Sequence, residues 1–100
     1  MKENEFRDRR VVPFLKSIKG LKYFIKEAVS IRSIPDIIGC YKGKFFALEL
    51  KRSLKEANKK TGRIVAQKYW LETWRVEADA KTFLVSPENF EEFKSLLVDI

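Results

Sequence analysis

A glycine-containing turn between two apolar runs constrains the fold of this chain more than any other feature. Lys42-Gly43 separates the run 36–41 from the run 44–51, and such pairs are typical of β-hairpin turns. With a two-residue loop the numbers of facing residues sum to 85, so Asp36 faces Glu49. A four-residue loop would keep this pairing, whereas a three-residue loop would break it. We therefore expect a hairpin that brings two carboxylates together at its open end.

The face that carries these carboxylates also carries Lys51, because residues two apart on a strand share a face. The other residues of that face are apolar, as are those of the opposite face, so we expect the hairpin in the middle of a sheet. The first set is Ile38, Cys40, Phe45 and Ala47, and the second is Ile37, Phe46, Leu48 and Leu50. Opposed like charges destabilise a sheet unless a positive group lies between them, and buried charges need partners or a metal.

Two carboxylates on adjacent strands offer the oxygen ligands that hard cations prefer. A cation bound there would polarise a phosphoryl oxygen and lower the pKa of a bound water. Lys51 would orient that water or stabilise the charge on the phosphate. These roles together predict phosphodiester hydrolysis.

The composition excludes several other chemistries. The chain has no histidine, and Cys40 is its only cysteine, which leaves too few ligands for a zinc site and rules out an intramolecular disulfide. Twenty-one Lys and Arg against fourteen Asp and Glu give a net charge of +7, which favours a polyanionic partner, first of all nucleic acid. No apolar run is long enough for a membrane span and the N-terminus does not resemble a signal peptide, so we expect an intracellular, cytoplasmic protein without a membrane partner.

One hundred residues without a repeat or a linker predict a single domain over 1–100. Apolar spacing and turn signals give the expected elements. These are a helix over about 3–19, a strand over 21–29, the hairpin strands, a loop over 52–63, a helix over 64–76, a strand over 81–85 and a helix from Ser86 to about 98. Pro13 should kink or restart the first helix. The order α-β-β-β-α-β-α predicts an α/β (α+β) domain with helices flanking a central mixed sheet.

The chemistry-bearing residues also carry a family resemblance. Pro35-Asp36, twelve residues, and then Glu49-Leu50-Lys51 resembles the PD-(D/E)XK signature. The wider runs 33–39 and 46–51 resemble the VRR-NUC nucleases and the small Holliday-junction resolvase-like proteins. Gln67 is similar to the glutamine on the helix that follows the motif in those proteins. The resemblance covers roughly residues 3–86.

The resemblance implies a restriction-endonuclease-like core and a magnesium- or manganese-dependent DNA endonuclease, a hydrolase selective for branched or four-way junction DNA. It implies that Asp36, Glu49 and the carbonyl of Leu50 bind the metal, together with an acidic residue of the first helix. We choose Glu5 for that position, with Asp8 and Glu3 as alternatives. It also implies a homodimer, since one site cuts one strand at a time and paired cuts need two sites.

The remaining candidates admit more than one reading. Gln67 is either a catalytic residue or a polar residue partly covered by its helix. Six basic residues are candidates for contact with nucleic-acid phosphates: Arg32, Lys55, Lys59, Lys60, Arg63 and Lys68. The aromatic residues Tyr69, Trp70 and Trp74 are expected to pack rather than to stack on bases, and Cys40 is expected in the core. The alternative functions are a non-catalytic DNA-binding module that retains the nuclease fold and a basic subunit that binds RNA or a protein partner.

Overall fold

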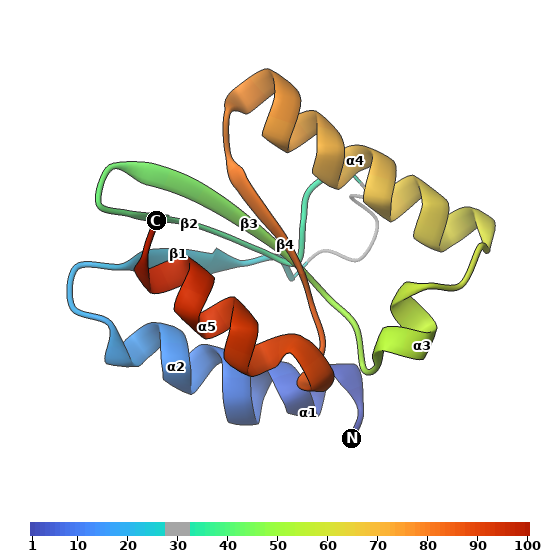
Figure 1. Ribbon diagram of the computed structural model, residues 1–100, viewed down its shortest axis with the longest axis horizontal. Helices are drawn as coiled ribbons and strands as arrows, with labels where there is room; N and C mark the ends of the chain where they lie inside the picture. Colours follow the sequence, from blue (N-terminus) through green and yellow to red (C-terminus); the bar gives the residue numbers. More distant parts are fainter. Residues whose placement is uncertain (28–32) are drawn as a thin grey trace.

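The computed structural model describes residues 1–27 and 33–100. Four strands form one mixed sheet in the order β1-β2-β3-β4, with helices on both of its faces (Figure 1). In chain order the elements are α1 (Glu3–Phe6), a π-helical turn (Arg7–Val11), α2 (Val12–Ser17), β1 (Lys22–Ile25), β2 (Ile37–Tyr41), β3 (Lys44–Leu50), α3 (Leu54–Ala57), α4 (Gly62–Ala78), β4 (Lys81–Val85), a 3-10 turn (Pro87–Asn89) and α5 (Phe90–Val98). The predicted mixed α/β class with a flanked central sheet is confirmed. The predicted order lacks the short helix α3.

The hairpin of β2 and β3 has the predicted register. Ile38 pairs with Ala47 and Cys40 with Phe45, so the paired residue numbers sum to 85. Lys42 and Gly43 form the turn with φ angles of 54° and 74°, as a two-residue turn with two left-handed residues requires. β1 extends the sheet antiparallel to β2, whereas β4 lies parallel to β3. β3 is therefore an interior strand, and its second half is buried.

The main core lies on one face of the sheet, against α1, α2 and α5 (Figure 1). Its fully buried side chains include Phe6, Leu15, Ile37, Phe46, Leu48, Leu50, Val85 and Leu97. The first helix passes through the π-helical turn before α2 begins. Pro13, in the first turn of α2, cannot donate to the carbonyl of Arg9 four residues earlier, so the α-helical pattern must change in the turn before it. The backbone stays helical from Glu3 to Ser17, so the first helix changes its hydrogen-bond pattern before Pro13 and does not restart there.

The other face of the sheet is covered only in part. α4 packs on β3 and β4 and buries Ile64 and Leu71, which leaves the hairpin tip open. Phe45 is 63% exposed and Cys40 is half-buried. The prediction that both faces of the hairpin are covered, with Cys40 in the core, is therefore wrong for the part of β2 and β3 that α4 does not reach.

Local capping accounts for one further departure from the expected elements, the short helix α3. The Ser53 hydroxyl accepts a hydrogen bond from the Glu56 N–H at 3.1 Å and begins α3 inside the predicted loop. Ser86 and Asn89 form a capping box before α5. Leu96 is 51% exposed, because Phe90, Phe93 and Leu97 define the buried face of α5. The predicted strand over 21–29 ends at Ile25, and residues 28–29 lie outside the described ranges.

No helix within the described parts of the chain is both long enough and apolar enough to cross a membrane.

Gly39 should be the least replaceable glycine of the sheet. A Cβ at this position would collide with the Phe46 ring and with the Lys22 carbonyl oxygen, whereas a Cβ at Gly62 would meet nothing within 4 Å. Gly39→Ala should therefore lower the free energy of unfolding by about 3 kcal/mol, since strand backbone must shift. Gly62→Ala is the control and should be neutral or stabilising by about 0.5–1 kcal/mol. Urea denaturation measures both, and equal stability of the two variants would contradict the prediction.

Candidate active site

The open end of the hairpin brings Asp36 and Glu49 together, as the register predicts. Asp36 directly precedes β2, and its Oδ2 accepts a hydrogen bond from the Leu50 N–H at 2.8 Å. Its carbonyl accepts another from the Lys26 N–H at 2.9 Å. Glu49 lies in β3, between β2 and β4, and only 3% of it is exposed. Both carboxylates are thus fixed by the backbone of interior or adjacent strands.

Glu49 is in an unfavourable environment for a carboxylate. Burial, a hydrogen bond with Asp36 and the negative charge of Asp36 raise the pKa of Glu49 to about 9, against the opposing effects of Lys51 and Lys26. Its Oε1 is buried and has no hydrogen-bond partner among residues 1–27 and 33–100. A buried polar atom without a partner is rare in proteins and calls for an explanation such as an ion or a water. The pair therefore holds a proton at neutral pH unless a cation takes its place.

A divalent cation fits this environment. Among the described residues no three His, Cys, Asp or Glu side chains come close enough together to hold a metal ion. A cation here would therefore take its protein ligands from Asp36, Glu49 and the Leu50 carbonyl, which is the predicted set without its acidic residue of the first helix. Mg²⁺ commonly uses one or two carboxylates and keeps several waters, so this donor set is sufficient. The Oε1 of Glu49, which has no hydrogen-bond partner among the described residues, could bind the cation.

Lys51 and Gln67 meet beside the acidic pair. Lys51 is only 4% exposed, and its ammonium donates a hydrogen bond to Oε1 of Gln67. Gln67 lies on α4, and the hydroxyl of Thr61, the N-cap of this helix, accepts a hydrogen bond from the Ile64 N–H at 3.4 Å. Of the two readings of Gln67, the structure favours a site residue, because its amide is the partner of the buried lysine.

The first helix contributes Glu3, not Glu5, to the site. Glu3 lines the main cavity beside Asp36, and burial and then the charge of Asp36 raise its pKa. Glu5 is not among the residues that line this cavity. Residues two apart on a helix point about 200° away from each other, so burial of Phe6 in the core settles which acid faces the sheet. Asp8 is exposed and pairs with Arg7 at 2.7 Å.

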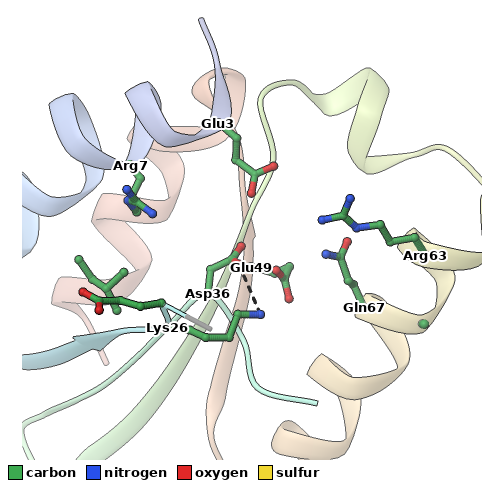
Figure 2. Close-up of a pocket in the computed structure, with 10 residues that line it drawn as sticks. Glu3, Arg7, Lys26, Asp36, Glu49, Arg63 and Gln67 are labelled. Atoms are coloured by element: carbon green, nitrogen blue, oxygen red, sulfur yellow. Dashed lines mark ion pairs between the residues drawn. The ribbon is translucent and has the colours of Figure 1, made fainter. Parts of the chain in front are cut away.

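These residues surround a cavity of about 700 Å³ (Figure 2). Its lining comprises Glu3, Arg7, Ile25, Lys26, Glu27, Asp36, Glu49, Arg63, Ala66 and Gln67. The Lys26 ammonium donates to the Ile34 carbonyl at 3.0 Å and lies 4.0 Å from Oδ1 of Asp36. Sequence reasoning missed Lys26 and Arg7. The spacing of Glu3 and Arg7, four residues apart on one helix face, was the available signal for Arg7.

The structure divides the six basic candidates. Arg63 lines the main cavity, and Lys59 lines a neighbouring cavity of about 220 Å³ together with Lys51 and Arg63. The others that are described, Lys55, Lys60 and Lys68, are exposed and line neither cavity. Arg32 lies outside the described residues.

The aromatic residues of α4 differ from expectation. Tyr69 is 61% exposed and Trp70 is 38% exposed, so the prediction that both are packing residues is wrong. The reason is the partial cover of the sheet, since α4 buries only Ile64 and Leu71. Trp74 is half-buried and donates its indole N–H to the Ser33 carbonyl at 2.9 Å.

Neither family models, nor curated proteins, nor solved structures give a match to this chain.

Proposed function

We propose that this chain is a magnesium- or manganese-dependent DNA endonuclease of the PD-(D/E)XK type. The single observation that carries the proposal is the buried, unpartnered Oε1 of Glu49 next to Asp36. Burying two carboxylates side by side is costly unless a cation neutralises them. A DNA-binding module without catalysis has no need for this arrangement, whereas a hydrolase without it has no metal site.

Each residue has a distinct role in this proposal. Asp36, Glu49 and the Leu50 carbonyl would hold the cation, which when bound supplies Lewis-acid stabilisation of the phosphate and a water of lowered pKa. Lys51 donates a hydrogen bond to the phosphate oxygen on which charge develops, and Gln67 holds its ammonium in place. Hydrolysis adds the water oxygen to phosphorus and breaks the bond from phosphorus to one sugar oxygen.

Charge supports a nucleic-acid substrate. The acidic pair lies in a protein with a net charge of +7, and Arg63 stands at the edge of the cavity across from Glu3 (Figure 2). Basic groups around a carboxylate pair would hold the phosphodiester backbone while the carboxylates bind the cation.

Cleavage of a substrate panel tests the proposal. Supercoiled, linear, single-stranded, flapped and four-way DNA, with an RNA of the same sequence, are incubated with Mg²⁺, Mn²⁺ or EDTA. We expect metal-dependent cutting of DNA by the wild type and none by Glu49→Gln purified in parallel, which controls for contaminating nucleases. Binding without cutting under every condition would support the non-catalytic module instead. Cutting of RNA alone would reassign the substrate.

The proposal includes a homodimer on branched DNA. Phe24 and Phe45 are 64% and 63% exposed. Both lie on the part of the α4 face of the sheet that α4 leaves uncovered, because Phe24 pairs with Ile38 and Phe45 with Cys40. An uncovered apolar face favours association. Sedimentation with and without a four-way junction measures the state. A monomer in both conditions that makes only single-strand nicks would leave a simple nicking nuclease.

Gln67→Leu should slow cleavage about 10- to 100-fold at saturating metal, the usual cost of losing a residue that orients a catalytic group. The change removes the acceptor of the Lys51 ammonium at nearly constant volume. DNA affinity should stay near the wild-type level, since one uncharged side chain replaces another. Glu72→Gln, a change at an exposed position of the same helix, is the control. Single-turnover kinetics measure both variants, and a wild-type rate for Gln67→Leu would remove the glutamine from the mechanism.

A further inference from the structure

Three adjoining cavities form one groove across the acidic pair. The main cavity holds Asp36 and Glu49. A smaller one of about 60 Å³ is lined by Arg7, Lys26 and Leu50 among others, and the cavity of about 220 Å³ lies on the side of Lys59 and Arg63. All three cavities share Glu3 as a lining residue. We call their union the groove.

Basic side chains lie at both ends of the groove, and the carboxylates lie between them. Arg7 lies on the side of the first helix, and Arg63 lies across the pocket on α4 (Figure 2). The basic residues predicted from the sequence account for the Arg63 side alone. The basic side chains on the Arg7 side have no role in the proposed hydrolysis, although they line the same groove.

Arg7 has donors to spare for a ligand. Its Nε and Nη2 donate to the Asp8 carboxylate at 2.7 and 3.2 Å, which uses two of the five N–H donors of a guanidinium. The Asp8 side chain is 58% exposed, so this ion pair is solvated and holds Arg7 only weakly. Arg7 also opens the π-helical turn, a rare helix type that recurs at functional sites.

Lys26 has a different part in the same end of the groove. Its ammonium donates a hydrogen bond to the Ile34 carbonyl and lies near Asp36. Its backbone N–H donates a hydrogen bond to the Asp36 carbonyl. It thus holds the segment that carries Asp36 and adds positive charge beside Arg7.

We propose that Arg7, supported by the charge of Lys26, binds a backbone phosphate on the opposite side of the scissile bond from the phosphate that Arg63 binds. A single DNA strand then crosses the groove with phosphates held on both sides of the carboxylates. This inference rests on the proposed function, which places the scissile bond at Asp36 and Glu49, and it adds Arg7 as a substrate-binding residue.

The salt dependence of binding tests this inference without cleavage. A labelled single-stranded DNA oligonucleotide is titrated in EDTA over a series of NaCl concentrations, and anisotropy gives the slope of log K against log salt. Arg7→Gln should reduce the magnitude of the slope by about 0.7, the value for one phosphate contact on a single strand. Arg7→Gln with Arg63→Gln should reduce it by about 1.4, because the two residues contact different phosphates. Arg7→Lys should restore most of the slope.

Arg9→Gln is the matched control. Arg9 lies in the same π-helical turn, is exposed and lines none of the three cavities, so its loss removes the same net charge without a contact. A slope for Arg7→Gln equal to that of Arg9→Gln would overturn the inference, and circular dichroism checks that both variants are folded. If the wild type shows the Arg7-dependent slope but cuts nothing with Mg²⁺ or Mn²⁺, the nuclease proposal fails, while phosphate binding by Arg7 is upheld. If it cuts DNA while Arg7→Gln matches the control, the groove fails and the nuclease proposal stands.

Discussion

Glu49→Gln should lower the single-turnover rate of DNA cleavage by about 10³-fold, the upper end of the range for loss of one group that stabilises transition-state charge. The substitution keeps the volume of the side chain and removes the negative charge that would bind the cation. Among the described residues its Oε1 is buried without a hydrogen-bond partner. The substitution therefore removes the negative charge from a group that is positioned to bind the cation. Asp36→Asn should have an effect of the same order.

DNA binding should survive these substitutions. The pKa of Glu49 is raised to about 9, so in the metal-free protein its carboxyl is uncharged at neutral pH, and the glutamine hardly changes the charge that the phosphate backbone meets. Glu72→Gln is a suitable control, because Glu72 is exposed on α4 and pairs only with the neighbouring Arg75 among its described ion pairs. Single-turnover cleavage and anisotropy of the three variants separate catalysis from binding. Normal cutting by both Glu49→Gln and Asp36→Asn would place the site elsewhere.

The acidic pair could be predicted from the sequence because it depends on local rules. A two-residue turn fixes the hairpin register, and alternation along a strand fixes which residues share a face. These two rules alone bring Asp36 opposite Glu49 and place Lys51 beside them. The observed register of β2 and β3 agrees with this derivation.

The parts that failed depend on tertiary contacts. The choice between Glu3 and Glu5 required the rotation of the first helix, which burial of Phe6 sets. The exposure of Phe45 depended on how far α4 reaches across the sheet, and no local pattern encodes that reach. Lys26 could not be found because it joins the site through the pairing of β1 with β2, far from the motif.

The metal-free protein should lose stability as the pH rises from about 5 to about 9. The pKa of Glu49 is raised to about 9 in the folded state, from an ordinary value near 4.5. Between these values the folded protein holds a proton that the unfolded chain has released. Folding stability falls with pH wherever the folded state binds more protons. The stabilisation is therefore complete below pH 4.5 and disappears as the pH approaches 9.

Comparison with Glu49→Gln isolates this carboxyl from the other titrating groups. The glutamine cannot ionise, so the difference in melting temperature between the two proteins should grow in favour of the variant as the pH rises. The raised pKa of Glu3 acts in the same direction, but it acts in both proteins and cancels. Parallel pH profiles would show that Glu49 ionises in the folded state as easily as in the unfolded chain.

Magnesium should reverse the loss of folding stability at high pH. A cation that binds only the folded protein stabilises it by mass action, and its carboxylate ligands must be deprotonated first. The increase in melting temperature on adding Mg²⁺ should therefore be larger near pH 9 than near pH 6 for the wild type, because the proton on the Asp36/Glu49 pair competes with the metal. Glu49→Gln should show a small shift at both values. A wild-type shift that does not change with pH would mean that Mg²⁺ binds elsewhere.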